Sequence, residues 1–314
     1  MENNCRDDLP LVSAVIPTRN RPDLVCRAIR SALNQSYSNL EVVVVVDGPD
    51  PVTVEILKVL REPRLRIVAL PENVGGGEAR NIGVREARGE FIALLDDDDE
   101  WLPEKTTKQL SAFLEADSED CLVASRYISR TPGQKDNVFP VRGPQANEPL
   151  SEWMFYAPGF QCPIRGAPTP SYFALKELFI LVPFRKGLKC HQDWDWFLRV
   201  MSNLNMNFLL LEEPLCVIHY DPNRSSVGKS IHWKDSLEWV DSSSSLFTAR
   251  AYSSFITHIC MPRCADTNNR LAAFRLMLRK CRKSTRLSVS QIILALKWYV
   301  LSPRIRRFIK QQLL

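Results

Sequence analysis

Short apolar runs alternate with stretches of helical hydrophobic spacing over the first hundred residues. The apolar runs, which suit strands buried on both faces, occupy residues 11–16, 41–46, 65–70 and 91–95. The helical spacing lies between them, at residues 23–34, 51–60 and 78–88. Because strands that alternate with helices of this length form βαβ units, the pattern predicts an α/β fold with a Rossmann-like, mainly parallel central sheet flanked by helices. We expect Pro17 to end the first strand.

The rest of the chain shows a different pattern. Residues 126–170 are rich in Pro, Gly and Asn, so we expect long loops with short strands there. Helical spacing returns at 194–203, and two further strands are predicted near 208–211 and 215–220. From Trp233 to the C-terminus the pattern is helical. We therefore predict an α/β domain over residues 1–232 and a helical region over residues 233–314.

Acidic side chains follow two of the predicted buried strands. The run that ends at Leu95 continues directly into four adjacent carboxylates, Asp96–Asp99, and the run that ends at Val46 is followed by Asp47. Parallel strands carry their carboxyl ends to one edge of a sheet, where α/β proteins bind ligands. Clustered carboxylates need a cation or many hydrogen bonds, and oxygen ligands suit Mg²⁺ or Mn²⁺ shared with a substrate phosphate. The alternative is a solvated acidic turn in which Asp98 or Asp99 caps a helix that begins near Pro103.

Composition is that of a soluble globular protein. The chain has 314 residues, 45% of them hydrophobic and 25% charged, enough for one α/β domain and an appendage. The first residues lack the basic and apolar segments of a signal peptide, and the nine cysteines show no metal-type spacing. We therefore expect free thiols and a cytoplasmic location.

Charge is distributed unevenly along the chain. Residues 270–314 contain 12 Lys or Arg and no Asp or Glu, which leaves 29 basic against 36 acidic side chains in the remainder. Within this basic tail, the apolar stretch 288–301 is shorter than the roughly 20 residues that span a bilayer. This combination predicts an interfacial helix on anionic lipid, at the cytoplasmic face of the membrane. The alternative is a set of helices that pack on the α/β domain. Nucleic acid is not an expected partner, because the acidic body would oppose its approach.

Five segments, in order, resemble the landmarks of the family 2 glycosyltransferases, which have the GT-A fold and use nucleotide-sugar donors. They are Val12–Arg21, Glu41–Gly48, Asn73–Gly83, Leu94–Trp101 with its DxD element, and Gln192–Arg199. The resemblance covers residues 10–228 and implies that residues 1–232 are a GT-A catalytic domain, followed by a basic helical extension. It implies transfer of a sugar from a nucleotide-sugar donor, with a UDP-linked donor expected. The implied acceptor is a hydroxyl of a glycan or lipid-linked saccharide in polysaccharide biosynthesis of the cell envelope.

The resemblance also implies residues that bind the nucleotide. Pro17, Thr18 and Arg19 correspond to positions that contact the base and ribose, and Asp47 to the residue that accepts hydrogen bonds from the base. An aromatic residue is frequent where this chain has Arg19, so base stacking would fall to the guanidinium plane and uridine is a weaker expectation. The alternative for Asp47 is the start of the turn at Asp47–Pro49.

The diphosphate and the metal ion are assigned in the same way. Arg80 would reach the diphosphate; its alternative is a surface ion pair with Glu78 or Glu86. Asp98 would bind Mn²⁺ or Mg²⁺ together with Asp96, while Asp96 or Asp97 would hold ribose or water. The run of four Asp leaves this register open.

The catalytic base implied by the resemblance is Asp193, which would deprotonate the acceptor hydroxyl in a displacement that inverts the anomeric configuration. The family often has Glu where this chain has Gln192. The alternative for Asp193 is a helix N-cap. Arg224, in a loop that follows the last strand, would clamp phosphate, and His219 is either a further metal ligand or a structural residue.

Two other functions are compatible with acidic strand ends in an α/β fold. A sugar-1-phosphate nucleotidyltransferase would need a basic loop for a triphosphate, and here only Arg19 and Arg21 stand early in the chain. A non-catalytic module that binds nucleotide-sugar or glycan is the second alternative. A Walker-type ATP site is unsupported, because no GK[ST] follows the glycines at 75–77.

Overall fold

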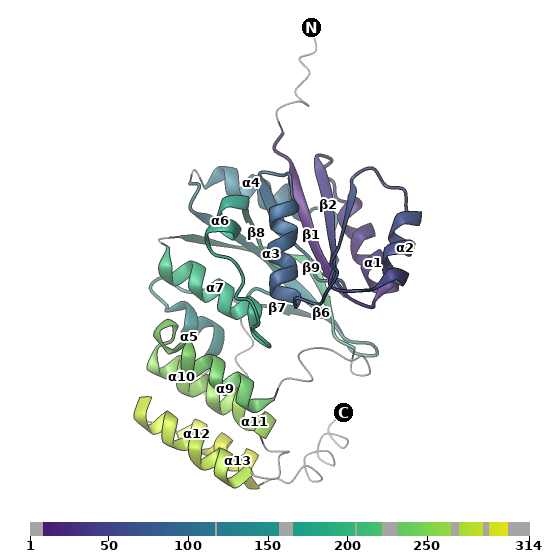
Figure 1. Cartoon of the computed structure of the whole chain (residues 1–314). Coiled ribbons are helices and arrows are strands. Elements are labelled where there is room, and N and C mark those ends of the chain that lie inside the picture. Colours follow the sequence, from purple (N-terminus) through teal and green to yellow (C-terminus); the bar gives the residue numbers. More distant parts are fainter. Residues whose placement is uncertain are drawn as a thin grey trace. The chain divides into compact units, whose positions relative to one another are not determined.

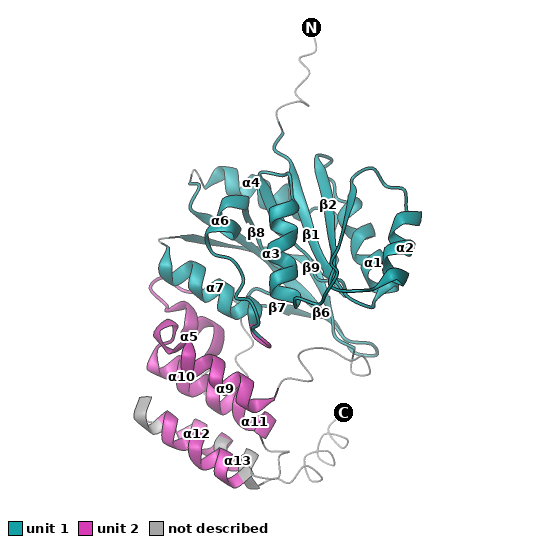
Figure 2. Cartoon of the chain, in the orientation of Figure 1, with its two compact units in different colours: residues 1–143, 167–188, 192–224 teal, residues 144–166, 189–191, 225–314 magenta. Residues whose placement is uncertain are grey.

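The computed structural model describes residues 9–116, 118–156, 166–204, 206–221, 232–264, 270–284 and 289–300. The chain forms two compact units (Figure 2). The first unit comprises Met1–Gly143, Ala167–Leu188 and Gln192–Arg224, and the second comprises Pro144–Gly166, Lys189–His191 and Ser225–Leu314. Two segments that precede the predicted boundary at residue 232 thus belong with the helices after residue 225.

The first unit is built on one mixed sheet (Figure 1). Its strands are β1 (Val12–Thr18), β2 (Leu40–Val46), β3 (Leu65–Ala69), β4 (Phe91–Leu94), β5 (Glu100–Trp101), β6 (Cys121–Arg130), β7 (Asn137–Phe139), β8 (Phe173–Leu175) and β9 (Asn207–His219). Its helices are α1 (Pro22–Leu33), α2 (Pro51–Val59), α3 (Gly76–Glu86), α4 (Lys105–Glu115), α6 (Lys176–Leu181) and α7 (Gln192–Asn203), with a short 3-10 helix, η1 (Thr169–Ser171).

Half of the sheet follows the pattern predicted from hydrophobic periodicity. The strands lie in the order β3-β2-β1-β4 and pair in parallel, with α1, α2 and α3 between consecutive strands. β1 and β4 are buried along their whole length, and β2 along all but one residue, because helices cover both faces. The alternation of strands and helices predicted for residues 11–95 is therefore confirmed.

Pro17 does not end the first strand, contrary to our expectation. β1 continues to Thr18 and stays in register with β2, where Pro17 lies opposite Val45. The carbonyl of Val15 accepts a hydrogen bond from Leu95, on the β4 side of the strand. Residues two apart point to the same side, so Pro17 faces the side on which β4 has already ended. Its missing N–H therefore costs no ladder hydrogen bond.

The other half of the sheet differs from the prediction. Residues 126–130, expected at the start of a region of long loops with short strands, form the second half of β6, which pairs with the distant strand β9. Pairing with β9 and β7 stabilises this stretch, although its polar composition gives no periodic pattern. The strands expected near 208–211 and 215–220 are one strand, β9, with a register shift at Pro214, the residue that cannot donate a ladder hydrogen bond.

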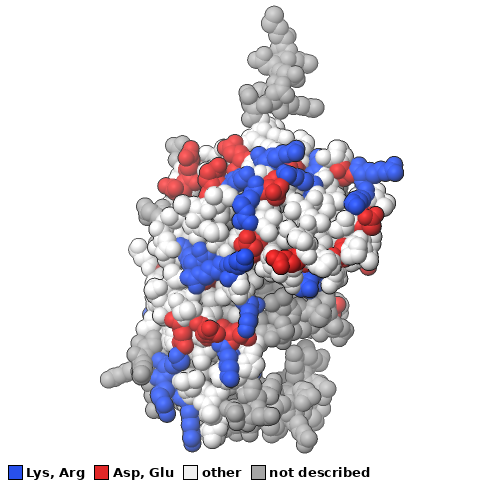
Figure 3. Space-filling view, viewed as in Figure 1, with Lys and Arg blue, Asp and Glu red and all other residues white. Residues whose placement is uncertain are grey.

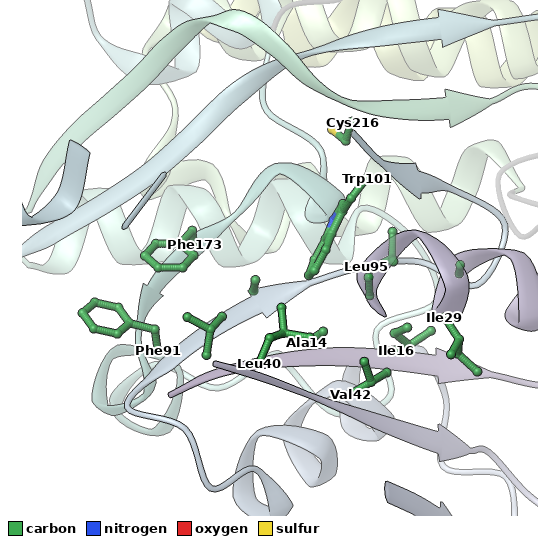
Figure 4. Packing of buried hydrophobic residues seen from close by; sticks show 14 of the residues in the cluster. Ala14, Ile16, Ile29, Leu40, Val42, Phe91, Leu95, Trp101, Phe173 and Cys216 are labelled. Atoms are coloured by element: carbon green, nitrogen blue, oxygen red, sulfur yellow. The ribbon is translucent and has the colours of Figure 1, made fainter. Parts of the chain in front are cut away.

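Alternate residues of the central strands divide the core into two layers. Val12, Ala14 and Ile16 of β1 face a hydrophobic cluster that includes Ile29 of α1 (Figure 4). On the other face, α3 lies so close to the sheet that a Cβ on Gly83 would be 2.4 Å from Cγ1 of Val15. Glycine at this position lets α3 approach β1, which brings the N-terminus of α3 to the carboxyl edge of the sheet.

The second unit is helical in the residues that the structure describes. Its helices are α5 (Leu150–Phe155), α9 (Trp233–Ser242), η2 (Ser244–Leu246), α10 (Ala249–Phe255), the π-helical turn η3 (Ile256–Cys260), α11 (Met261–Cys264), α12 (Arg270–Ser284) and α13 (Val289–Val300). Phe155 of α5 packs edge-to-face on Phe255, at 5.3 Å between ring centroids, and Trp239 contacts both rings. These aromatic contacts explain why α5 belongs with the later helices.

Two further features are the state of the cysteines and the length of the helices. All the cysteines that the structure describes are free and buried. None of the described helices combines the length and the apolar composition needed to cross a bilayer.

We predict that Gly83→Ala destabilises the first unit. The added Cβ would lie 2.4 Å from Val15 and 3.1 Å from Val45, so α3 must move or the strands must shift. Overpacking of this kind costs about 1–3 kcal/mol, measurable as a lower urea midpoint. Gly143→Ala is the matched control, because its nearest neighbour would be 3.5 Å away. Equal stability of the two variants would contradict the close approach of α3 to β1.

Candidate active site

The carboxyl ends of β1, β2 and β4 bring the predicted site residues to one edge of the sheet. β1 is the parallel neighbour of both other strands, so the residues that follow Val46 and Leu94 flank the end of β1. The backbone N–H of Asp47 donates to the carbonyl of Thr18 at 2.8 Å. The prediction that two buried strands carry acidic residues to the same edge is therefore confirmed.

Asp97 is the buried member of the acidic run. Its carboxylate accepts hydrogen bonds from Oγ1 of Thr18 at 2.8 Å and from Nη1 of Arg21 at 3.1 Å. Burial, then the neighbouring Asp98, raises the pKa of Asp97 to about 6, although Arg21 and Thr18 oppose this rise. Nη1 of Arg21 also lies 3.4 Å from Asp98, so one guanidinium compensates two carboxylates.

Arg80 binds the other side of the acidic run. Its guanidinium forms an ion pair with Asp96 and donates from Nη1 to Oε1 of Gln192 at 3.2 Å. The ring of Phe184 lies beneath the guanidinium, 5.6 Å away. Attraction to Asp96, and then to Asp193 and Asp97, raises the pKa of Arg80 in spite of its burial. Arg80 is therefore a permanent positive charge among several carboxylates.

The alternative partners considered for Arg80 are engaged elsewhere. Glu78 accepts hydrogen bonds from Asn81 at 2.9 Å and from Arg85 at 3.0 Å. Glu86 forms an ion pair with Arg66 at 2.5 Å. The interpretation of Arg80 as a surface residue paired with Glu78 or Glu86 is thus wrong, because α3 turns this side chain toward the sheet edge.

Asp193 lies in the first turn of α7 and is partly buried. Burial raises its pKa to about 6; a hydrogen bond from the backbone N–H of Trp194 lowers it, the charge of Asp96 raises it, and Arg80 lowers it. The influence of Asp96 and Arg80 places Asp193 in the same electrostatic cluster as the strand ends. Asp193 is not the N-cap, because α7 begins one residue earlier, at Gln192.

The carboxylate of Asp47 is occupied by backbone donors. It accepts hydrogen bonds from the N–H groups of Val74 at 2.7 Å and Gly75 at 3.0 Å, just before α3. Gly75 has a φ of 86°, a conformation that favours glycine. Asp47 therefore orders the loop that leads into α3 and positions Arg80 indirectly. Its interpretation as a base-binding residue stays a prediction.

Asp99 does not cap the following helix, contrary to one interpretation of the acidic run. Its Oδ1 accepts a hydrogen bond from the backbone N–H of His219 at 2.9 Å, and the N-cap of α4 is Glu104. The chain between them forms the short strand β5, which pairs with β9. Asp99 thus joins the acidic run to the end of β9.

His219 is held by a second acidic residue. Its Nε2 lies 2.6 Å from Oε1 of Glu100, and Nε of Arg27 lies 3.5 Å from the same oxygen. Arg27 also donates from Nη2 to the backbone carbonyl of Asp98 at 2.5 Å. Burial and the charge of Arg27 lower the pKa of His219.

The remaining predicted site residues are Pro17, Arg19 and Arg224. Pro17 lies within β1, and Arg19 is exposed at the bend after this strand. Arg224 lies outside the described residues. Arg21 and Arg27, which the sequence did not identify as site residues, both approach the acidic run from α1 and its N-terminus. Arg21 follows the first strand closely, and Arg27 lies about one and a half turns further along α1, where basic residues can face the ends of neighbouring strands.

The donor atoms near β4 suit a hard divalent cation. Asp96 and Asp98 are only partly buried, and mutual repulsion within the run contributes to the raised pKa of Asp97. Within the described part of the chain, no three His, Cys, Asp or Glu side chains form a ready metal cluster. Mg²⁺ and Mn²⁺ commonly take one or two protein carboxylates and complete their shell with water and substrate phosphates. The residues present fit such a shared site.

A central α/β sheet with acidic residues at its carboxyl edge is the arrangement of a GT-A glycosyltransferase. The mannosyltransferase PcManGT from Pyrobaculum calidifontis, solved in complex with GDP-Man and Mn²⁺, has the same fold, with a TM-score of 0.57. The match covers 96% of this chain and 84% of that chain, at 16% sequence identity. The predicted GT-A fold is confirmed.

Within this class, residues 13–157 match the family described as Glycosyl transferase family 2. The putative colanic acid biosynthesis glycosyl transferase WcaA of Escherichia coli K12 is 28% identical over 232 residues, which cover 73% of this chain and 78% of WcaA. The resemblance to family 2 of the glycosyltransferases that was drawn from the motifs is thus confirmed.

A second relative is named for a specific activity. The UDP-Glc:alpha-D-GlcNAc-diphosphoundecaprenol beta-1,3-glucosyltransferase WfaP of Escherichia coli is 30% identical over 122 residues, which cover 39% of this chain and 48% of WfaP. Several other relatives also match over less than half of their own length.

We predict a pH-dependent gain of stability in Asp193→Asn. The pKa of Asp193 is raised from about 3.9 in the unfolded chain to about 6 in the native protein, so between these values the native state binds more protons. The free energy of unfolding of the wild type should therefore fall as the pH rises through this window. Allowing for partial exposure, Asp193→Asn should gain about 1–2 kcal/mol relative to the wild type between pH 4 and pH 7.

Urea unfolding at several pH values in the presence of EDTA measures this difference. Asp120→Asn, at an exposed position, is the control and should follow the wild type. A stability difference that does not change with pH would contradict the raised pKa of Asp193.

Proposed function

We propose that this protein is an inverting glycosyltransferase that moves a sugar from a nucleotide-sugar donor, UDP-linked, to a hydroxyl of a glycan or lipid-linked saccharide. One observation carries the proposal. Asp193, with its pKa raised to about 6, shares an electrostatic cluster with Arg80 and the carboxylates that follow β4. A base and an anion-binding cation thus lie together at the carboxyl edge of a GT-A sheet.

In the proposed reaction, Asp193 accepts the proton of the acceptor hydroxyl. The hydroxyl oxygen forms a bond to the anomeric carbon while the bond from that carbon to the diphosphate oxygen breaks. A single displacement of this kind inverts the anomeric configuration. A pKa near 6 leaves Asp193 mostly ionised at neutral pH and still basic enough to accept a proton in the transition state.

Arg80 is the proposed contact of the donor diphosphate. Its Nε is buried and has no hydrogen-bond partner in the described part of the chain, although Nη1 and Nη2 contact Gln192 and Asp96. Gly76 keeps the neighbouring space open, since a Cβ there would lie 3.4 Å from both Nη1 of Arg80 and Oε1 of Gln192. Phosphate oxygens would satisfy the remaining donor and balance the permanent charge.

The nucleoside is assigned to the ends of β1 and β2. Pro17, Thr18 and Arg19 would line its base and ribose, with Asp47 at the base edge and Asp97 at the ribose. Thr18 and Asp97 are already joined by a hydrogen bond of 2.8 Å, so their positions are coupled. The name of WfaP gives UDP-Glc as its donor, which supports a uridine nucleotide here.

Asp98, with Asp96, is the proposed holder of Mn²⁺ or Mg²⁺. The mannosyltransferase from Pyrobaculum calidifontis, which shares the fold, was solved with Mn²⁺. When bound, such an ion supplies positive charge that stabilises the departing nucleoside diphosphate. Asp98 keeps one oxygen near Arg21 and is only partly buried, so it remains accessible to a cation.

The proposed acceptor belongs to polysaccharide biosynthesis. WcaA is named as a putative glycosyl transferase of colanic acid biosynthesis, and the name of WfaP gives a diphosphoundecaprenol-linked sugar as its acceptor. We therefore favour a lipid-linked saccharide, with the enzyme working from the cytoplasmic side as a peripheral protein. The nucleotidyltransferase alternative has no supporting observation, because Arg21, which it would need for a triphosphate, binds Asp97 and Asp98.

We predict that Asp193→Asn lowers kcat by at least roughly a hundredfold while nucleotide affinity stays within about threefold, since only proton transfer is removed. Turnover is measured by release of free nucleoside diphosphate, and binding by calorimetry. For the wild type, kcat/KM should rise with pH through about 6, as Asp193 ionises. Retention of most of the wild-type turnover by Asp193→Asn would exclude Asp193 as the base, and Asp120→Asn serves as the control.

We predict that Asp98→Asn weakens both Mn²⁺ and donor binding by roughly tenfold or more, because a neutral amide is a poorer ligand for a hard cation. Titration of Mn²⁺ by electron paramagnetic resonance, with and without UDP, measures the first effect. EDTA should abolish transfer by the wild type and added Mn²⁺ should restore it. Unchanged Mn²⁺ affinity in Asp98→Asn would assign the metal ion to other residues.

A further inference from the structure

The helix α13 of the second unit presents apolar side chains on an exposed face. Val289, Ile292, Ile293 and Leu296 are between 44% and 73% exposed. Their spacing of three and four residues places them along one stripe of the helix. Gln291 and Leu294, at 5% and 6% exposure, lie on the side of α13 that packs against the rest of the unit. Among the residues that the structure describes, the helix therefore buries one face and leaves an apolar stripe exposed.

The preceding helix, α12, also exposes apolar side chains. Leu271 and Leu276 of α12 are each 41% exposed, whereas Phe274 and Met277 are buried. α12 and α13 contact each other and run side by side in Figure 1. Large exposed apolar areas of this kind are unusual on soluble monomers and mark a surface that another body covers.

Positive charge surrounds the stripe. Residues 270–314 contain 12 Lys or Arg and no Asp or Glu. Arg275 and Arg279 of α12 are exposed, and Figure 3 shows Lys and Arg side chains projecting over this helix. Lys280 differs from them, because it forms an ion pair with Asp241 of α9 at 2.6 Å. The body that covers the stripe must therefore offer negative charge beside an apolar phase.

The length of α13 and the side chains on it favour a lipid bilayer as the partner that covers the apolar stripe. α13 has 12 residues, which extend about 18 Å, too short to cross a hydrocarbon core of about 30 Å. A helix with an apolar stripe and basic neighbours lies instead in the plane of the headgroups. A second copy of this chain would bring two segments of like charge together, and a nucleic acid would leave the apolar stripe uncovered.

We propose that α13 docks on the surface of an anionic bilayer, with Val289, Ile292, Ile293 and Leu296 inserted among the acyl chains near the headgroups. Arg275 and Arg279 of α12 contact lipid phosphates. The proposal deepens the proposed function, since a lipid-linked acceptor lies in the same surface, but vesicle binding is measured without any transfer reaction.

The test uses the full chain and vesicles of phosphatidylcholine with or without phosphatidylglycerol. The wild type should pellet with the anionic vesicles and not with the neutral ones, and added salt should weaken binding. The double variant Ile292→Ser, Ile293→Ser should bind roughly tenfold more weakly, because it loses two inserted side chains. Arg275→Gln with Arg279→Gln should also weaken binding and reduce its dependence on salt.

The matched control is Ile180→Ser with Leu181→Ser. These side chains of α6, in the first unit, are 49% and 67% exposed, so the variant removes at least as much exposed apolar surface away from α13 and should bind like the wild type. Circular dichroism checks that all variants are folded. Transfer to a soluble acceptor should be unaffected by the Ile292 and Ile293 changes, which separates failure of docking from failure of the proposed chemistry.

Three outcomes would overturn the proposal. The first is a wild type that does not pellet, as expected if residues 301–314 or a second copy cover the stripe. The second is equal binding to neutral and anionic vesicles. The third is unchanged binding of the Ile292 and Ile293 double variant, which would assign any lipid contact to the basic residues alone.

Discussion

Electrostatic compensation among the carboxylates at the sheet edge is the condition on which the rest of the site depends. Asp96, Asp97, Asp98 and Asp193 carry like charges in partly or fully buried positions, and burial and mutual repulsion raise the pKa of Asp97 and of Asp193 to about 6. Buried charges of one sign are stable only when opposite charges or hydrogen-bond donors accompany them. Two guanidinium groups, one on each side of the acidic run, supply that compensation.

The fold delivers these guanidinium groups by two different routes. Arg21 follows β1 directly and reaches Asp97 and Asp98 across the strand end. Arg80 depends on α3, whose start is ordered by hydrogen bonds from Val74 and Gly75 to Asp47, and whose Gly83 packs closely on Val15. A structural role for Asp47 and Gly83 thus supports the chemistry proposed for Arg80. The helix α7 then adds Asp193 and Gln192 from a distant part of the sequence.

The accuracy of prediction followed the strength of the local signal. The parallel half of the sheet was predictable because its strands are buried on both faces and therefore uniformly apolar, as in Val42–Val46. The extent of the second half of β6 was not predicted, because residues 126–130 mix polar and apolar side chains and gain their stability from pairing with β9. β9 was predicted as two strands because Pro214 interrupts its hydrophobic pattern. In the structure β9 continues past Pro214, and the pairing with β6 shifts register there. Arg21 and Arg27 were missed because a basic residue after a strand has no distinctive pattern of its own.

The sequence by itself determined which residue types meet at the edge of the sheet. Hydrophobic periodicity indicates where the parallel strands lie, and the motifs contain the acidic residues that follow these strands. It left open the partner of Arg80, the role of Asp99 and the path of residues 121–130. Only the tertiary structure decided these, by bringing Arg80 to Asp96, His219 to Asp99 and β6 beside β9. The physical reason is the sequence separation of the interacting residues. Periodicity reflects burial within one helix or strand, whereas ion pairs and strand pairing join residues far apart in the chain.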